Sequence, residues 1–219
     1  MPGYSADDTI APGAASVATG HRARPRRVGP AELTGWLSER TSRLAELWWA
    51  EILAREVGPG AVTERVLRRF VDDLLEMLPM LLGPRRELVQ PLWKRAAELF
   101  GTMAAKRGLA AGEVIEEFNL LRELVIRELY REPPLDARLP LSLRDVLRLS
   151  RALDAAVTHA SVGHTDAMFF QFFETDGVAP ASATDIAGEA ERELEAIHAE
   201  LTAILAHEPS TKGRRVGPA

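Results

Sequence analysis

The sequence predicts an all-α protein, with a bundle of about five helices followed by one further helix. Apolar residues recur at steps of three and four along most of the chain, which is the spacing of one face of an α-helix. Breaks rich in glycine and proline interrupt the pattern at 58–60, Gly83-Pro84, Arg107-Gly108 and Pro133-Pro134. Because 46% of the 219 residues are hydrophobic, the chain can bury a substantial core.

Proline positions set the expected bounds of the first three helices. The first helix is expected over about 30–57, because proline suits a first helical turn. The second follows the break at 58–60, and Pro79 is expected to kink it or end it one turn early. The third is expected over about 90–107, with Pro91 in its first turn.

The fourth helix, expected over 111–131, has the most regular apolar stripe in the chain. This stripe consists of Val114, Phe118, Leu121, Val125 and Leu129. A fifth, long helix is expected over about 141–174, and its first half is a regular amphipathic pattern. Both helices are long enough to form two sides of a bundle.

The fifth helix ends in an unusually aromatic segment. Four phenylalanines in five positions cannot all face one core, so part of the segment is expected to form a homodimer contact or to be surrounded by several helices. A wall of a ligand pocket is the other possibility. The candidate interface comprises Met168, Phe169, Phe170, Phe172 and Phe173.

The rest of the chain divides by composition. Residues 1–28 and 208–219 are expected to be disordered tails, and 29–174 to form the main domain. A linker over 175–184 leads to a helix over 185–207, whose apolar residues form a short coiled-coil-like seam. Because three heptads are marginal alone, this helix should pair with a copy of itself or with the main domain.

Charge and composition exclude several classes of protein. The net charge is −5, and the basic ends leave about −10 on residues 29–208, so nucleic-acid binding by the folded part is unlikely. No apolar run approaches the ~20 residues of a membrane helix, and the N-terminus lacks the features of a signal peptide. The chain has no cysteine, which excludes disulfides and thiolate chemistry. A cytoplasmic protein is expected.

The five histidines are the main candidates for a functional site, and three of them carry specific hypotheses. His159 and His164 lie on the fifth helix, and either could ligate haem iron from an apolar pocket, although a surface or hydrogen-bonded histidine is the simpler interpretation. His198 lies in a segment faintly similar to the phosphoacceptor helix of a histidine kinase, which raises the alternative of phosphotransfer.

Other catalytic or metal-binding patterns are weak. Asp72, Asp73 and Glu76 form an acidic group on the second helix that resembles an aspartate-rich Mg²⁺ motif, but the second acidic motif that such sites need is missing. The sequence has no glycine-rich nucleotide loop and no local Ser/His/Asp pattern. We therefore expect no enzymatic activity, no metal and no cofactor.

The middle of the chain resembles a known sensor domain. Arg107-Gly108, a short loop, and then Glu117-Phe118 and Leu121-Arg122 are similar to the N-terminal sensor domain of RsbR/RsbRD-type stress proteins. The same domain precedes the catalytic part of many bacterial sensor histidine kinases. The resemblance covers residues 36–173 and extends to helix order and domain size.

This resemblance implies a globin-like bundle that binds no haem and serves as a signal-input, dimerising and scaffolding module. Such domains usually continue into a STAS domain or a kinase core, and residues 175–219 are too few for either. The chain is then expected to act as a non-enzymatic homodimer that regulates a signalling protein partner. Glu117, Asn119 and Arg122 are the candidate partner or ligand surface, although Arg122 could instead pair with a nearby carboxylate.

Overall fold

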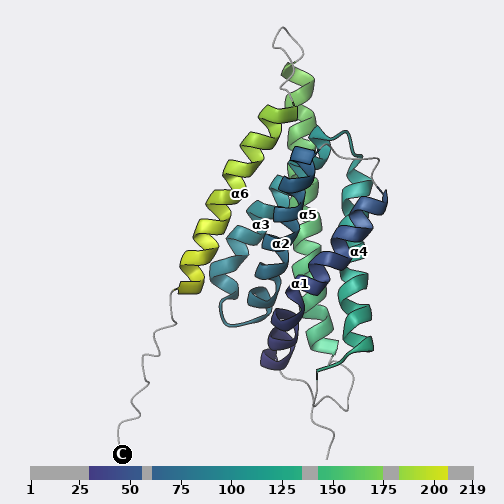
Figure 1. Ribbon diagram of the computed structural model, residues 1–219, viewed down its shortest axis with the longest axis vertical. Helices are drawn as coiled ribbons and strands as arrows, with labels where there is room; N and C mark the ends of the chain where they lie inside the picture. Colours follow the sequence, from purple (N-terminus) through teal and green to yellow (C-terminus); the bar gives the residue numbers. More distant parts are fainter. Residues whose placement is uncertain (1–29, 56–60, 135–142, 175–182, 207–219) are drawn as a thin grey trace, which may run out of the picture.

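The computed structural model describes residues 30–55, 61–134, 143–174 and 183–206, and these residues form a bundle of six α-helices (Figure 1). The helices are α1 Pro30–Arg55, α2 Ala61–Leu82, α3 Arg86–Lys106, α4 Ala111–Arg131, α5 Leu143–Glu174 and α6 Ala183–Ala206. The predicted all-α class is confirmed for the described residues, which contain no strand. The tails predicted over 1–28 and 208–219, and most of the linker predicted over 175–184, lie outside them.

The turn between α3 and α4 follows the prediction closely. Gly108 has a φ of 81°, which glycine adopts without steric cost. The N–H of Gly108 donates to the carbonyl of Ala105, and the N–H of Leu109 donates to that of Ala104, which is the Schellman arrangement that ends a helix. A carboxylate oxygen of Glu113 then accepts a hydrogen bond from the N–H of Ala110 at 2.7 Å, which caps the N-terminus of α4.

The structure corrects two expectations about prolines, the early end of α2 at Pro79 and the start of α3 near Pro91. Pro79 does not end α2, which continues to Leu82 because Leu81 and Leu82 bury their side chains and this packing offsets the one lost hydrogen bond. α3 begins at Arg86, so Pro91 lies in its second turn rather than its first. Buried Val89 lies before this proline and extends the helix toward its N-terminus.

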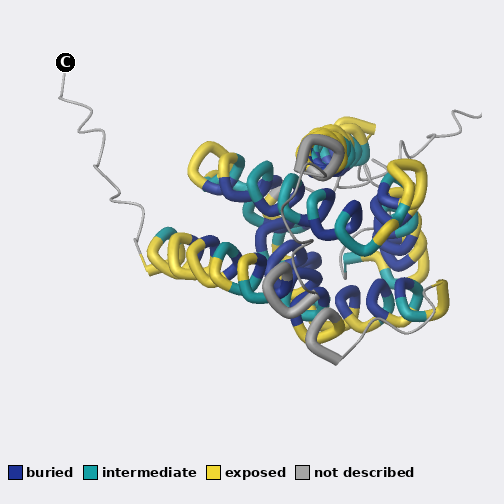
Figure 2. The backbone as a smooth tube through the Cα atoms, turned by 90° about the horizontal axis from the view of Figure 1, so that it is seen from above, coloured by how far each residue is buried: buried dark blue, intermediate teal, exposed yellow. Residues whose placement is uncertain are grey.

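The core is a cluster of aromatic side chains from four helices. Trp48 of α1, Phe70 of α2, Phe100 of α3 and Phe118 of α4 pack with ring centroids 5.0–6.1 Å apart. The indole N–H of Trp48 donates to the backbone carbonyl of Glu117 at 3.0 Å, so this buried polar group is satisfied. Buried residues face this interior and exposed residues face outward (Figure 2).

Helices α3 and α5 cross at backbone contact. A Cβ added to Gly101 would lie 1.8 Å from the carbonyl oxygen of Ala160, and one added to Gly163 would lie 1.9 Å from that of Glu98. Only glycine allows two backbones to approach this closely. The crossing therefore fixes α5 within the bundle.

The C-terminal helix α6 packs on the body of the same chain, along one side of the bundle (Figure 1). It contacts α2 and α3, and it begins at Ala183, two residues before the predicted start. The predicted seam faces the bundle: Ala187, Ala190, Leu194, Ile197 and Leu201 are buried, and Ile204 near the end of the helix is partly buried. The helix was expected to pair with a copy of itself or with the main domain, and in the structure it packs on the main domain.

None of the described helices is both long enough and apolar enough to cross a membrane.

Candidate functional site

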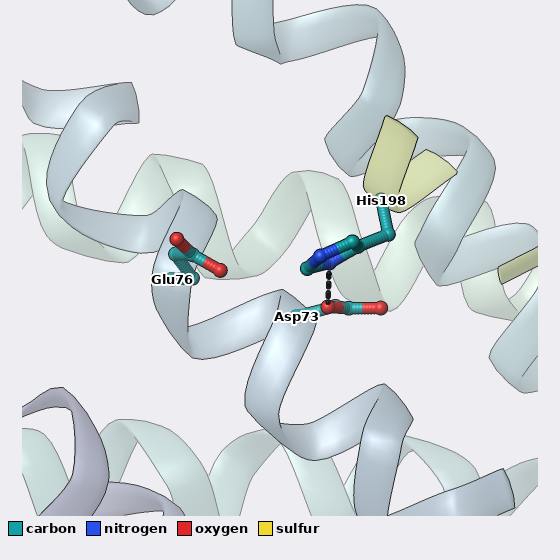
Figure 3. A group of neighbouring side chains, drawn as sticks. All are labelled: Asp73, Glu76 and His198. Carbon is teal, nitrogen blue, oxygen red and sulfur yellow. Dashed lines mark hydrogen bonds and ion pairs between the residues drawn. The ribbon is translucent and has the colours of Figure 1, made fainter. Parts of the chain in front are cut away.

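The junction between α2 and α6 holds a histidine–carboxylate pair that links residues far apart in the sequence. His198 of α6 lies over Asp73 of α2, with 2.9 Å between Nδ1 and Oδ1 (Figure 3). The buried seam residues Leu194, Ile197 and Leu201 bring His198 to this position, because they fix which face of α6 meets α2. A carboxylate can only accept, so the imidazole Nδ1–H is the donor.

The two partners differ in exposure. Asp73 is only 4% exposed, and its Oδ2 has no hydrogen-bond partner among the described residues. Burial raises the pKa of Asp73 above its usual range, and the hydrogen bond from His198 opposes that rise. The His198 side chain is 47% exposed.

Glu76 adds a third potential ligand to the pair. One donor atom from each of Asp73, Glu76 and His198 lies within 4.8 Å of the others (Figure 3). Carboxylate oxygen and imidazole nitrogen are ligands that Zn²⁺ accepts, and a water would have to supply the fourth position of a tetrahedron. Asp72 takes no part, because it pairs with Arg68 one turn away at 3.4 Å. Sequence reasoning treated the acidic group and His198 separately, and the fold brings them together.

The two histidines considered for haem are both engaged by neighbouring groups. His159 lies 2.6 Å from a carboxylate oxygen of Glu98, and His164 lies 2.7 Å from the carbonyl oxygen of Leu109. Both face the crossing where α3 and α5 are in backbone contact. A haem ligated from this face would require the two helices to separate, so the described geometry favours structural roles for both side chains.

The three residues predicted as a partner surface lie in different environments. Glu117 is only 5% exposed, Asn119 is exposed, and Arg122 forms an ion pair with Asp154 of α5. The alternative that Arg122 pairs with a nearby carboxylate is therefore the observed one. Only Asn119 presents its side chain freely to the surface, so the three do not form one contact patch.

The carboxyl group of Glu117 is the most strongly perturbed group in the described part of the chain. Burial raises its pKa to about 7, while the positive charges of Arg107 and Arg55 oppose the rise. Burial in turn lowers the pKa of Arg107, against the field of Glu117 and Glu113. The two groups thus interact electrostatically at the α3–α4 junction, where the predicted sensor motif lies.

The aromatic end of α5 is exposed in the single chain. Phe169 is 60% exposed and Phe170 is 63% exposed, with their rings edge to face at 6.3 Å, and Met168 beside them is also exposed. The side chains of Phe172 and Phe173 lie outside the described part of the structure. This end of α5 extends beyond the other helices, at the top of Figure 1.

No family model, curated protein or solved structure matches this chain. The fold and the site define an all-α bundle with a titratable junction between its last helix and its body. The globin-like arrangement and the resemblance to RsbR-type sensor domains stay predictions from the sequence.

Proposed function

We propose that the chain is a non-enzymatic sensing or scaffolding module of bacterial stress or two-component signalling. In this proposal it forms a cytoplasmic homodimer through the aromatic end of α5 and regulates a protein partner through α6. The proposal rests on one structural observation. The exposed aromatic end of α5 is followed along the chain by α6, which packs on the bundle through a buried seam with charged residues around it.

The attachment of α6 supports a regulated role. Around its apolar seam, α6 is held by ion pairs with side chains of α2 and α3, most of them partly exposed. They are Arg65–Glu191, Arg69–Glu195, Arg95–Glu193, Arg95–Glu200 and Lys106–Glu189. Exposed pairs of this kind contribute about 0–1 kcal/mol each, so the rim orients α6 without fixing it strongly. Most of the free energy of docking therefore comes from the buried apolar seam, and the ion pairs set the orientation of α6.

The position of α6 in the chain supports the same role. Residues 175–182 connect the aromatic end of α5 to the first turn of α6. A second copy that covers Phe169 and Phe170 would bury apolar area and restrict the chain at this connection. We therefore expect dimer formation to stabilise the docked position of α6, and its loss to release the helix toward a partner.

Hydrogen exchange tests this coupling. In the double variant Phe169→Asp/Phe170→Asp, the backbone amides of α6 should exchange severalfold faster than in the wild type at the same concentration, while those of α1–α4 stay unchanged. A double substitution at exposed positions of α1, Ala50→Asp/Ala54→Asp, is the control and should leave the exchange of α6 as it is. Equal exchange of α6 in all three proteins would contradict the coupling.

Phosphotransfer through His198 is a second candidate, and one observation favours it. The Nδ1 of His198 is held by Asp73, so the imidazole is oriented, and about half of the His198 side chain is exposed to a phosphoryl donor. Incubation with a phosphorylated response regulator or with a kinase should then label the wild type and leave His198→Ala unlabelled. Equal labelling of the two proteins would end this candidate.

A further inference from the structure

Four arginines surround an open pocket at the end of the bundle where α5 begins. The pocket has a volume of about 600 Å³ and lies between the first half of α5 and the turn that joins α2 to α3. Arg86 of α3 lines it from one side, and Arg144, Arg148 and Arg151 of α5 line it from the other. Because the three α5 arginines are spaced by four and three residues, they share one face of the helix.

The floor of the pocket is apolar. Leu81, Leu82 and Trp93 belong to the buried core, and the indole N–H of Trp93 is already used in a bond to Ala152 at 2.9 Å. Leu143 and Leu147, one turn apart on α5, are exposed at the pocket. A charged rim over aliphatic surface is the arrangement that binds a ligand with an ionic head and an apolar body.

The described part of the chain places no carboxylate against the positive charge of this pocket. Within the described residues, no carboxylate oxygen comes within ion-pair distance of these four guanidinium groups, and no Asp or Glu lines the pocket. Many arginines elsewhere in the described residues are paired, as Arg43 is with Glu128 at 3.1 Å and Arg95 with Glu193 at 2.7 Å. Four like charges around one cavity make it a favourable place for an anion, in a chain whose net charge is −5.

We infer that this pocket binds a small amphipathic organic phosphate, a phosphate monoester with an aliphatic body. Guanidinium groups bind phosphate oxygens in pairs, and a dianionic head uses several of them where a carboxylate uses one or two. The volume falls within the ~300–1,000 Å³ of small-molecule pockets. No residue of α6 lines the pocket, so this inference goes beyond the proposed function and does not depend on it.

Titration calorimetry with octyl phosphate, kept below its micellar concentration, tests the inference on the full chain. We expect one molecule to bind per chain, and inorganic phosphate and octanol to bind at least about tenfold more weakly, since each supplies only one half of the contacts. The double variant Arg148→Gln/Arg151→Gln should weaken binding of octyl phosphate by about tenfold or more.

The control variant also replaces two arginines by glutamine, but outside the pocket. Arg127→Gln/Arg131→Gln changes two exposed arginines of α4, outside the pocket, and should bind octyl phosphate within about twofold of the wild type. Thermal unfolding of each variant checks that it is folded. Absence of octyl phosphate binding, or equal loss in the two variants, would overturn the inference.

A membrane surface is the competing partner for an arginine cluster beside exposed leucines. Sedimentation with phosphatidylglycerol vesicles distinguishes a membrane surface from a small organic phosphate as the partner. Binding to vesicles without binding to monomeric octyl phosphate would overturn the small-molecule inference, whereas octyl phosphate binding that phosphatidylglycerol vesicles do not compete away would support it.

Discussion

Gly163 decides how closely two helices of the bundle pack. Its missing side chain lets α5 lie against the backbone of α3, and Gly101 does the same from the opposite helix. The hydrogen bond from Thr102 Oγ1 to the carbonyl of Gly163, 3.2 Å long, lies at the same crossing. A side chain at this point must push the two helices apart.

Substitution of Gly163 by alanine should therefore destabilise the protein. The new Cβ would lie 1.9 Å from the Glu98 carbonyl oxygen, and relieving this clash should cost about 3 kcal/mol in the free energy of unfolding. Gly35→Ala is the matched control, because nothing lies within 4 Å of its Cβ position and alanine suits a helix interior better by roughly 0.5–1 kcal/mol. Urea unfolding measures both, and similar free energies for the two variants would contradict the close crossing.

Glu117 makes the stability of the fold depend on pH. Its pKa is about 7 in the folded protein against an ordinary value of 4.5, so the folded state holds the proton more tightly than the unfolded state. Stability should then fall as pH rises from about 4.5 to about 7, by up to roughly 3 kcal/mol, and the loss should be complete above pH 7.

Replacing the acid by its amide should remove this dependence. We expect Glu117→Gln to gain stability relative to the wild type as the pH is raised from 5 to 8, in urea unfolding at each pH. The neighbouring residue provides the control, because Glu116 is exposed and Glu116→Gln should show the pH profile of the wild type. Identical profiles for the two variants would show that Glu117 does not carry the effect.

Single residues also show where sequence reasoning reaches its limit. The charge of Glu117 predicts a surface residue, whereas Glu117 is buried in the structure. Its spacing, three residues after Val114 and four before Leu121, fits the buried face of α4, but the prediction from its charge did not use this spacing. No local pattern could pair Asp73 with His198, which are 125 residues apart, because that contact depends on how α6 docks. The arginines of the pocket share a helix face, but only the fold shows that no acid faces them.

At the scale of elements, apolar spacing predicted which segments are helical, but it predicted less accurately where the helices begin and end. α4 matches its predicted bounds because a glycine in the left-handed region and a capping carboxylate mark its beginning. α2 and α3 extend past the prolines because burial of the adjacent apolar residues outweighs the local cost of proline. Tertiary packing therefore decided the bounds at the two positions where the local signal failed.

The docking of α6 can be tested by changing one residue of its seam. Ile197→Asp places a charge among fully buried side chains, so α6 should leave the body and exchange its amide hydrogens at nearly the rate of an unfolded segment. The adjacent Ala196 is exposed, and Ala196→Asp should leave α6 protected.

The rest of the bundle has its own aromatic core, so α1–α5 should stay protected in Ile197→Asp. Hydrogen exchange followed by mass spectrometry reads all six helices at once. Loss of protection throughout the chain would show instead that α6 is an integral part of the core and not a releasable element.

At the scale of the whole molecule, two ends of the bundle differ in character. Where α5 begins, four arginines line a pocket. The other end of α5 extends beyond the other helices (Figure 1), and Phe169 and Phe170 are exposed there. α5 passes through the bundle between these ends and contacts α2, α3 and α4. A ligand at one end and a second copy at the other would therefore both act on the same helix.

The account depends most on the second copy of the chain. Burying Phe169 and Phe170 in a symmetric contact removes apolar surface from water, and a charge at both positions would have to be buried without a partner. Ala50→Asp/Ala54→Asp adds the same charge on exposed positions of α1 and should leave assembly unchanged.

The mass of the protein in solution, measured by light scattering on a sizing column at tens of micromolar, is the most direct test. We predict twice the chain mass of 24.0 kDa for the wild type and a single chain mass for Phe169→Asp/Phe170→Asp. A wild type that runs as a single chain, with the double variant indistinguishable from it, would contradict the account.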